Sequence, residues 1–111
     1  EGARIIVHMA NLVLPYCQEA MPVRCLENRI FAVTANRVGE ERRLGETLRF
    51  TGASQITGPL GEKLARASAD RPEAIAVEID PEQAEDKAVT PRNDLFRDRR
   101  PGLYKRMFGG A

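Results

Sequence analysis

Two cysteines and one histidine are the side chains of this 111-residue chain that could act as a nucleophile and its base. They are Cys17, Cys25 and His8. A thiol next to an imidazole can give up its proton and attack an electrophilic carbon, so a Cys/His pair is one hypothesis. The structural alternative is favoured. His8 would be a hydrogen-bonded histidine of the core or the pocket edge. Cys17 would lie at a pocket edge, at an interface or packed, and Cys25 would be a small buried hydrophobe.

Metal chemistry is not indicated by the same residues. The sequence has no CxxC motif and no second cluster of metal ligands at useful spacing. We therefore expect no metal, no cofactor, and two reduced thiols in a cytoplasmic protein.

An amide that follows an apolar run is the next chemical feature. Asn11 comes just after the strand predicted at Arg4–His8 and begins the loop predicted at Asn11–Gln18, where Pro15 resists helix continuation. A short amide at the carboxyl end of a strand in an open α/β layer is well placed to contact a ligand. The same side chain could instead satisfy the backbone of its own loop, and both interpretations stay open.

Five short segments are predicted to form strands, with a strand–helix–strand unit at the start that indicates an α/β fold. They are Arg4–His8, Ile30–Asn36, Ser54–Thr57, Leu64–Ala67 and Ala74–Ile79. The first has apolar residues in succession, so we expect both of its faces to be covered. The sequence Gly-Pro-Leu-Gly at 58–61 predicts a hairpin between the third and fourth strands.

Helices are predicted at about Glu19–Asn28 and from Asp80 to about Lys87. Pro22 suits the first helix only if it lies in the first turn, where the missing N–H costs little. Asp80 is predicted to cap the second helix, with Pro81 at its first position. The polar segment 37–48 is predicted to be an exposed loop.

Charge is nearly balanced, at a formal +1, and 42% of the residues are hydrophobic. That apolar content is sufficient for a folded core. Acids dominate residues 70–88 and bases dominate residues 89–111, which a solvated surface explains. No apolar run approaches the roughly 18 residues of a membrane span. We therefore expect neither a nucleic-acid nor a membrane partner.

Five motifs in order along the chain resemble those of the nitrilase (carbon–nitrogen hydrolase) superfamily. The resemblance covers the chain from its first residue to about Tyr104. The motifs are His8-Met9-Ala10-Asn11, the R-x-x-E-N-R of Arg24–Arg29, the N-x-x-G of Asn36–Gly39, the F-x-G-x-S-x-I of Phe50–Ile56 followed by Pro59-Leu60-Gly61, and Asn93-Asp94 with Asp98-Arg99-Arg100.

The resemblance implies a fold and an activity. It implies that the chain is the C-terminal part of a nitrilase-like αββα sandwich, with residues 1–88 in the hydrolase domain and residues 89–111 as an extended tail. It implies hydrolysis of a non-peptide C–N bond in an amide, nitrile or carbamoyl compound by a Glu–Lys–Cys triad. In the family all three residues precede the strand with which this chain begins, so we expect none of the catalytic residues here and no activity from the chain alone.

The resemblance also suggests roles for individual segments. The strand end and the loop after it would line the substrate pocket, which makes Asn11, Met9, Ala10 and Tyr16 the expected substrate contacts. At Met9 the family commonly has proline. The helix at 19–28 and the tail at 89–111 are expected to form a homo-oligomer surface. The alternative is a non-catalytic interaction module derived from the same fold.

Overall fold

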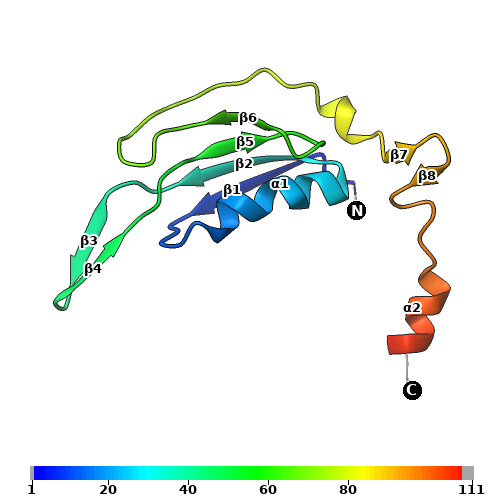
Figure 1. Cartoon of the computed structure of the whole chain (residues 1–111), viewed down its shortest axis with the longest axis horizontal. Helices are drawn as coiled ribbons and strands as arrows, with labels where there is room; N and C mark the ends of the chain where they lie inside the picture. The colour runs from blue at the N-terminus through cyan, green and yellow to red at the C-terminus, as the bar shows by residue number, and fades with distance from the viewer. Residues whose placement is uncertain (1, 109–111) are drawn as a thin grey trace.

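A four-stranded mixed sheet forms the body of the chain in the computed structural model, which describes residues 2–108 (Figure 1). Its strands are β1 (Ile5–Ala10), β2 (Phe31–Asn36), β5 (Gln55–Thr57) and β6 (Lys63–Arg66), in the order β1-β2-β5-β6. β1 and β2 run parallel, and the other neighbours are antiparallel. The predicted hairpin through residues 58–61 is confirmed, because it joins β5 to β6.

The helix α1 (Tyr16–Asn28) connects the two parallel strands and lies along one face of the sheet (Figure 1). It begins directly after Pro15 and ends where Arg29 adopts a left-handed conformation, with φ +50°. The prediction that it begins at Glu19 is wrong. Pro22 consequently lies in the helix interior rather than in the first turn.

The core lies between α1 and the sheet. Cys25 and Ala32 are almost completely buried there, so the prediction that Cys25 is a core residue is confirmed. Gln18 and Gln55 are also buried, each at about 1% exposure. Buried amides need hydrogen-bond partners, so this layer is held by polar as well as apolar contacts.

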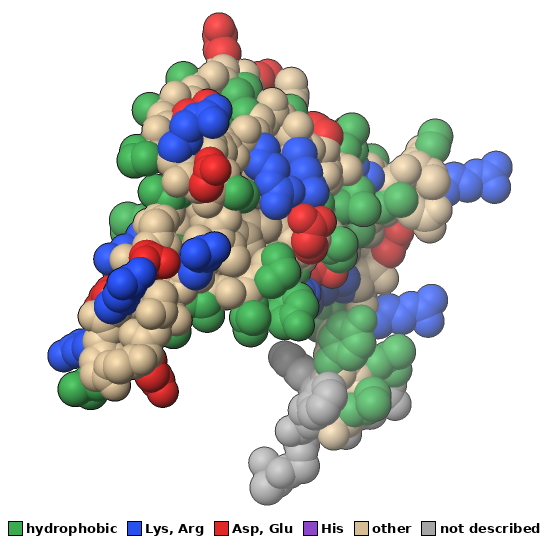
Figure 2. All heavy atoms as spheres, turned by 60° about the vertical axis from the view of Figure 1, so that its left-hand side comes forward, with side chains coloured by type: hydrophobic (Ala, Val, Ile, Leu, Met, Phe, Trp, Pro, Cys, Tyr) green, Lys and Arg blue, Asp and Glu red, His purple; other side chains and the backbone are tan. Residues whose placement is uncertain are grey.

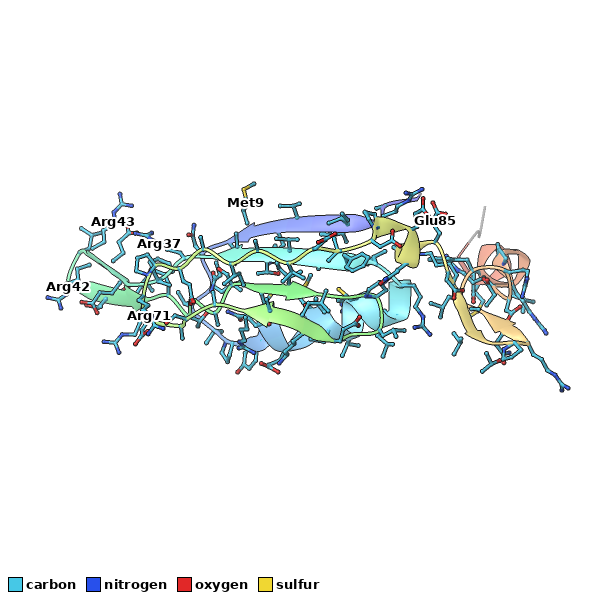
Figure 3. The ribbon with its side chains drawn as sticks, turned by 90° about the horizontal axis from the view of Figure 1, so that it is seen from above. Met9, Arg37, Arg42, Arg43, Arg71 and Glu85 are labelled. Atoms are coloured by element: carbon cyan, nitrogen blue, oxygen red, sulfur yellow. The ribbon has the colours of Figure 1, made fainter. Side chains whose placement is uncertain are left out.

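The face of β1 that is turned away from α1 is open. Val7 is 67% exposed and Met9 is 83% exposed, and Figure 3 shows Met9 pointing away from the sheet. Within residues 2–108, no strand pairs with the outer edge of β1. The prediction that both faces of this strand are covered is therefore wrong for residues 2–108, in which no second layer lies against that face.

The prediction that residues 37–48 form a loop is wrong. Most of this segment belongs to a hairpin of two paired strands, β3 (Glu40–Arg43) and β4 (Glu46–Arg49). Its two-residue turn is Leu44-Gly45, with φ values of +51° and +83°. Two successive positive φ values match the right-handed twist of paired strands, which is why this turn closes a hairpin. The hairpin extends beyond the sheet as an arm (Figure 1), and Figure 2 shows charged side chains of both signs along it.

Two predictions between β6 and the tail are wrong. Ala74–Ile79 has no strand pairing and runs as an extended connection past the sheet (Figure 1). The second predicted helix is reduced to one 3₁₀ turn, η1 (Pro81–Ala84). The predicted cap is confirmed, because the Asp80 carboxylate accepts a hydrogen bond from the Glu82 N–H at 3.0 Å.

The tail contains more structure than its sequence indicated. It forms the short strands β7 (Ala88–Thr90) and β8 (Asn93–Asp94), then the helix α2 (Pro101–Phe108), and it leads away from the sheet (Figure 1). Residues 109–111 of the predicted tail lie outside the described part of the chain. Neither helix within residues 2–108 is long and apolar enough to cross a membrane.

Candidate functional site

The loop that follows β1 is fixed by a buried asparagine at the end of β2. Ala10 and Asn36 are register partners, so the two strands end side by side. The Asn36 Oδ1 accepts a hydrogen bond from the Leu12 N–H at 2.9 Å. Its Nδ2 donates to the Thr51 Oγ1 at 2.9 Å and to the Gly52 carbonyl at 2.7 Å. One amide therefore joins three segments of backbone around this loop.

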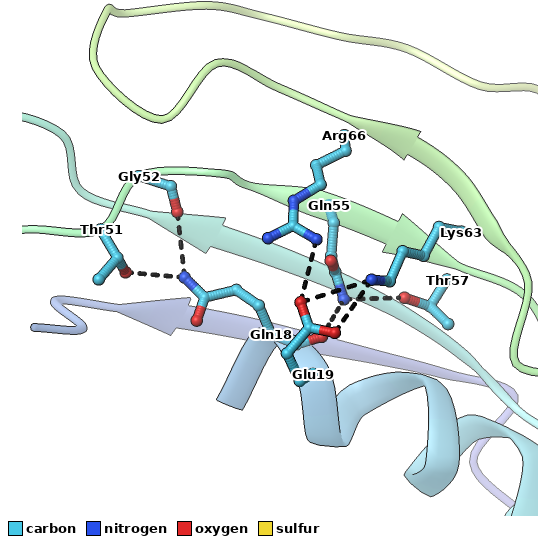
Figure 4. A network of polar contacts seen from close by, with 8 residues as sticks. All are labelled: Gln18, Glu19, Thr51, Gly52, Gln55, Thr57, Lys63 and Arg66. Carbon is cyan, nitrogen blue, oxygen red and sulfur yellow. Dashed lines mark hydrogen bonds and ion pairs between the residues drawn. The ribbon is translucent and has the colours of Figure 1, made fainter. Parts of the chain in front are cut away.

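Thr51 holds the same loop from the other side. Its N–H and its hydroxyl both donate to the Leu12 carbonyl, at 2.8 and 3.1 Å. Gln18 of α1 donates through Nε2 to the Thr51 Oγ1 at 2.8 Å and to the Gly52 carbonyl at 3.2 Å (Figure 4). Both backbone groups of Leu12 are thus hydrogen-bonded, and the neighbouring Asn11 is presented to solvent from a fixed position.

The four residues expected to contact substrate are only partly brought together. Ala10, Asn11 and Tyr16 lie along the segment that leads from β1 into α1, and Tyr16 is 73% exposed. Met9 projects from the opposite face of β1, because successive residues of a strand alternate between faces. Its side chain therefore does not share a surface with that of Ala10.

The two thiols have different surroundings. The Sγ of Cys17 lies 3.8 Å from Nδ1 of His8, and Cys17 is half-buried. Cys17 was expected in a loop, but it is the second residue of α1. Burial raises the pKa of Cys25 to about 11, and the charge of Glu62 adds to the effect. Cys25 is consequently a protonated core thiol at neutral pH.

An acid and two bases meet at the other side of α1. Glu19 accepts hydrogen bonds from Lys63 at 3.2 Å and from Arg66 at 3.3 Å, both of β6 (Figure 4). The hydrogen bond from Lys63, followed by that from Arg66, lowers the pKa of Glu19. All three side chains are exposed, and within residues 2–108 no cysteine is a hydrogen-bond or ion-pair partner of Glu19. The cluster joins the helix to the edge strand.

A groove of about 680 Å³ lies between β1, α1 and the tail. Its apolar lining includes Ile6, Met21 and Phe96. Lys87 borders it and donates to the Asn28 and Arg29 carbonyls at 2.9 and 2.8 Å, which caps the end of α1. Burial lowers the pKa of Lys87, and the charge of Asp94 opposes that shift.

A metal centre is not found in the described part of the chain. No three side chains of His, Cys, Asp or Glu within residues 2–108 are grouped so that they could hold an ion.

Comparison with known proteins assigns the family. The model of the family described as carbon-nitrogen hydrolase matches residues 1–88. The chain belongs to the carbon–nitrogen hydrolase family. This confirms the superfamily that the five sequence motifs indicated, and it accounts for the strand–helix–strand unit at the start of this carbon–nitrogen hydrolase chain.

Individual relatives agree with the assignment. The carbon–nitrogen hydrolase chain is 46% identical over 106 residues to a protein named nitrilase from Pyrococcus abyssi, covering 96% of this chain and 39% of the relative. It is 38% identical over 82 residues to an N-carbamoylputrescine amidase from Oryza sativa subsp. japonica, covering 70% of this chain and 27% of that enzyme.

The fold agrees as well. The crystal structure of a carbon–nitrogen hydrolase from Helicobacter pylori superposes with a TM-score of 0.74 at 28% identity, covering 96% of this chain and 41% of that one. The predicted α/β class is thereby confirmed. The chain spans about two fifths of the length of the Pyrococcus relative and of the Helicobacter structure.

Three contacts at this site were missed by sequence reasoning. Asn36 was assigned only to a strand exit, Gln18 to a loop, and the pairing of Glu19 with β6 was not considered. A signal existed for Asn36, since a polar residue that closes an apolar strand must find partners when it is buried. No comparable signal in the sequence identified Gln18 or Glu19.

Proposed function

We propose that this chain is the C-terminal part of an enzyme that hydrolyses a non-peptide C–N bond in an amide, nitrile or carbamoyl compound. The family match over residues 1–88 carries the proposal. The named relatives include a nitrilase and a carbamoylputrescine amidase, which supports this range of substrates. A reduced, cytoplasmic enzyme without a cofactor is part of the same proposal.

We also propose that the Glu–Lys–Cys triad is contributed by a segment upstream of this chain. Cys25 is a buried, protonated thiol, and the Sγ of Cys17 contacts His8. The Glu19–Lys63 pair is an exposed link between α1 and β6. Within residues 2–108, neither thiol is hydrogen-bonded to both an acid and a lysine, the neighbours that such a triad needs to activate sulfur.

The open surfaces of β1 support the same assignment. Its exposed apolar face and unpaired outer edge would be costly in a protein that acted alone. A sheet packed against that face would remove these apolar side chains from water. In the parent enzyme the remainder of the sandwich would supply that sheet.

For substrate contact we propose the loop at the end of β1. Asn11 is its central residue, because Asn36 and Thr51 fix the backbone beside it. Ala10 and Tyr16 would line the same side. Met9 would reach a substrate only from the side of the second sheet.

The activity proposal is tested by assaying the purified 111-residue chain for ammonia release from an amide, a nitrile and an N-carbamoyl compound. The Pyrococcus abyssi relative is the positive control, and Cys17→Ala is the matched variant. We expect no turnover by the chain. Turnover that Cys17→Ala abolishes would overturn the proposal. The DNA upstream of the Glu1 codon is a second test. A start codon there with no cysteine codon between it and Glu1 would favour the non-catalytic module.

We further propose that the helix at 19–28 and the tail at 89–111 form a contact between copies of the chain. The outer side of α1 exposes Val23 and Leu26, and α2 exposes Leu103 and Tyr104. Exposed apolar groups on helices are typical of an interface.

The oligomer proposal is tested by sedimentation of the parent chain and of Leu103→Lys. Leu44→Lys is the matched control, because Leu44 is 97% exposed at the tip of the β3–β4 hairpin, outside the proposed contact. We expect the unsubstituted 111-residue chain to associate, Leu103→Lys to weaken association, and Leu44→Lys to associate as the unsubstituted chain does. Equal effects of the two substitutions would contradict this surface.

A further inference from the structure

Cys17 and His8 meet where the first turn of α1 crosses β1. The Cys17 Sγ lies 3.8 Å from the His8 Nδ1, within hydrogen-bonding range for sulfur. The two residues come from different elements, and both are half-buried. The contact is therefore created by the crossover between β1 and α1.

We propose that Cys17 is a modification site, a thiol that His8 activates toward soft carbon electrophiles. This inference goes beyond the proposed function and does not depend on it, because it concerns only residues of this chain. The chemical class of reagent is an uncharged carbon electrophile, such as an α-halo amide, small enough to approach a half-buried thiol.

The reaction is a substitution at carbon. His8, with its proton on Nε2, accepts the thiol proton at Nδ1 as the Cys17 Sγ attacks the carbon that bears the halogen. The S–C bond forms, the carbon–halogen bond breaks, and the halide leaves with the bonding electron pair. The imidazolium then releases its proton to solvent, so His8 is regenerated while Cys17 stays alkylated.

Space for a small reagent lies beside His8. That residue borders the groove of about 680 Å³ between β1, α1 and the tail, and the groove has a largely apolar lining. A small uncharged electrophile can partition into such a space.

Cys25 provides an internal reference in the same chain. It is fully buried, and burial raises its pKa to about 11. Trypsin should separate the two thiols, since cleavage after Arg4, Arg24 and Arg29 places Cys17 in peptide 5–24 and Cys25 in peptide 25–29. One alkylation reaction followed by peptide mass spectrometry therefore reports on both.

The experiment measures iodoacetamide alkylation of the full chain at pH 7, in buffer and in urea, for the parent and for His8→Gln. Glutamine remains polar but cannot accept the thiol proton. We expect Cys17 of the folded parent to react about tenfold faster than in urea, which is modest for assistance by a general base. We expect Cys25 to react far more slowly than Cys17 in buffer and at a similar rate in urea.

His8→Gln is expected to remove most of the Cys17 enhancement in buffer and to change nothing in urea. Circular dichroism establishes whether the variant is folded. If the variant is unfolded, the proposal is tested by the unsubstituted chain alone, from the rates of Cys17 alkylation in buffer and in urea. A Cys17 that reacts no faster in the folded parent than in urea, or equally fast in folded His8→Gln, would overturn the proposal.

Discussion

Pro22 lies inside α1, and Gln55 of β5 makes the hydrogen bond that this proline cannot make. Proline has no N–H, so the Gln18 carbonyl one turn earlier lacks its helical donor. The Gln55 Nε2 donates to that carbonyl at 2.9 Å instead. We predict that Gln55→Leu destabilises the chain, and that Pro22→Ala reduces the cost of the change.

The magnitude follows from the carbonyl that loses its partner. A buried carbonyl without a hydrogen bond costs about 1–3 kcal/mol, so we expect Gln55→Leu to lower the free energy of unfolding by about 2 kcal/mol. Alanine at position 22 restores the N–H that donates to Gln18. In that background we expect Gln55→Leu to cost about 1 kcal/mol less, which is the net value of one hydrogen bond.

The assay is a double-mutant cycle by urea unfolding, followed by far-ultraviolet circular dichroism. All variants are measured at one protein concentration, because association changes apparent stability. Pro22→Ala combined with Leu44→Ala is the control, since Leu44 lies at the tip of the β3–β4 hairpin. The control should be additive within about 0.5 kcal/mol. If the Pro22–Gln55 cycle is equally additive, Gln55 is not a substitute donor for α1.

Gly52→Ala should lower the free energy of unfolding by about 2 kcal/mol or more, because φ is +52° and a Cβ would lie 2.3 Å from the Ala69 carbonyl oxygen. Gly45→Ala, at φ +83° with open space around it, is the control in urea unfolding and should cost less. Glu19→Gln should lower the melting temperature at pH 7. Because the pKa of Glu19 is lowered in the folded chain, its ion pairs stabilise the fold above its ordinary pKa of 4.5, and this stabilisation is lost as pH falls through the lowered pKa. The difference in melting temperature between Glu19→Gln and the unsubstituted chain should therefore disappear in acid. A difference that stays constant with pH would refute this. Asn36→Ala removes three hydrogen bonds and should cost about 2–3 kcal/mol, whereas Asn11→Ala, at an exposed amide, should leave urea unfolding unchanged.

Much of the local structure could be predicted from residue types alone. The apolar segment at Ile30–Asn36, the turn at 58–61 and the cap at Asp80 each have a local cause, and the structure confirms all three. The errors occur where tertiary context decides. Ala74–Ile79 has the residues of a strand but pairs with none within residues 2–108.

The hairpin at Glu40–Arg49 shows the opposite error. Its residues are polar and were assigned to a loop, yet pairing across the Leu44-Gly45 turn makes two strands. Strand propensity mostly reflects the surface on which a residue packs, so charged residues can form a pair that is exposed on both sides. Hydrophobic patterning could not have identified it.

Sequence by itself determined the family, the order of β1, α1 and β2, and the identity of the exposed amide at Asn11. Those features depend on residue types at fixed spacing. The tertiary structure alone decided that Asn36 binds the loop beside Asn11, that Gln55 satisfies the helix at Pro22, and that Cys17 meets His8. Such contacts depend on how a crossover and a strand register bring distant residues together, and no local pattern encodes that arrangement.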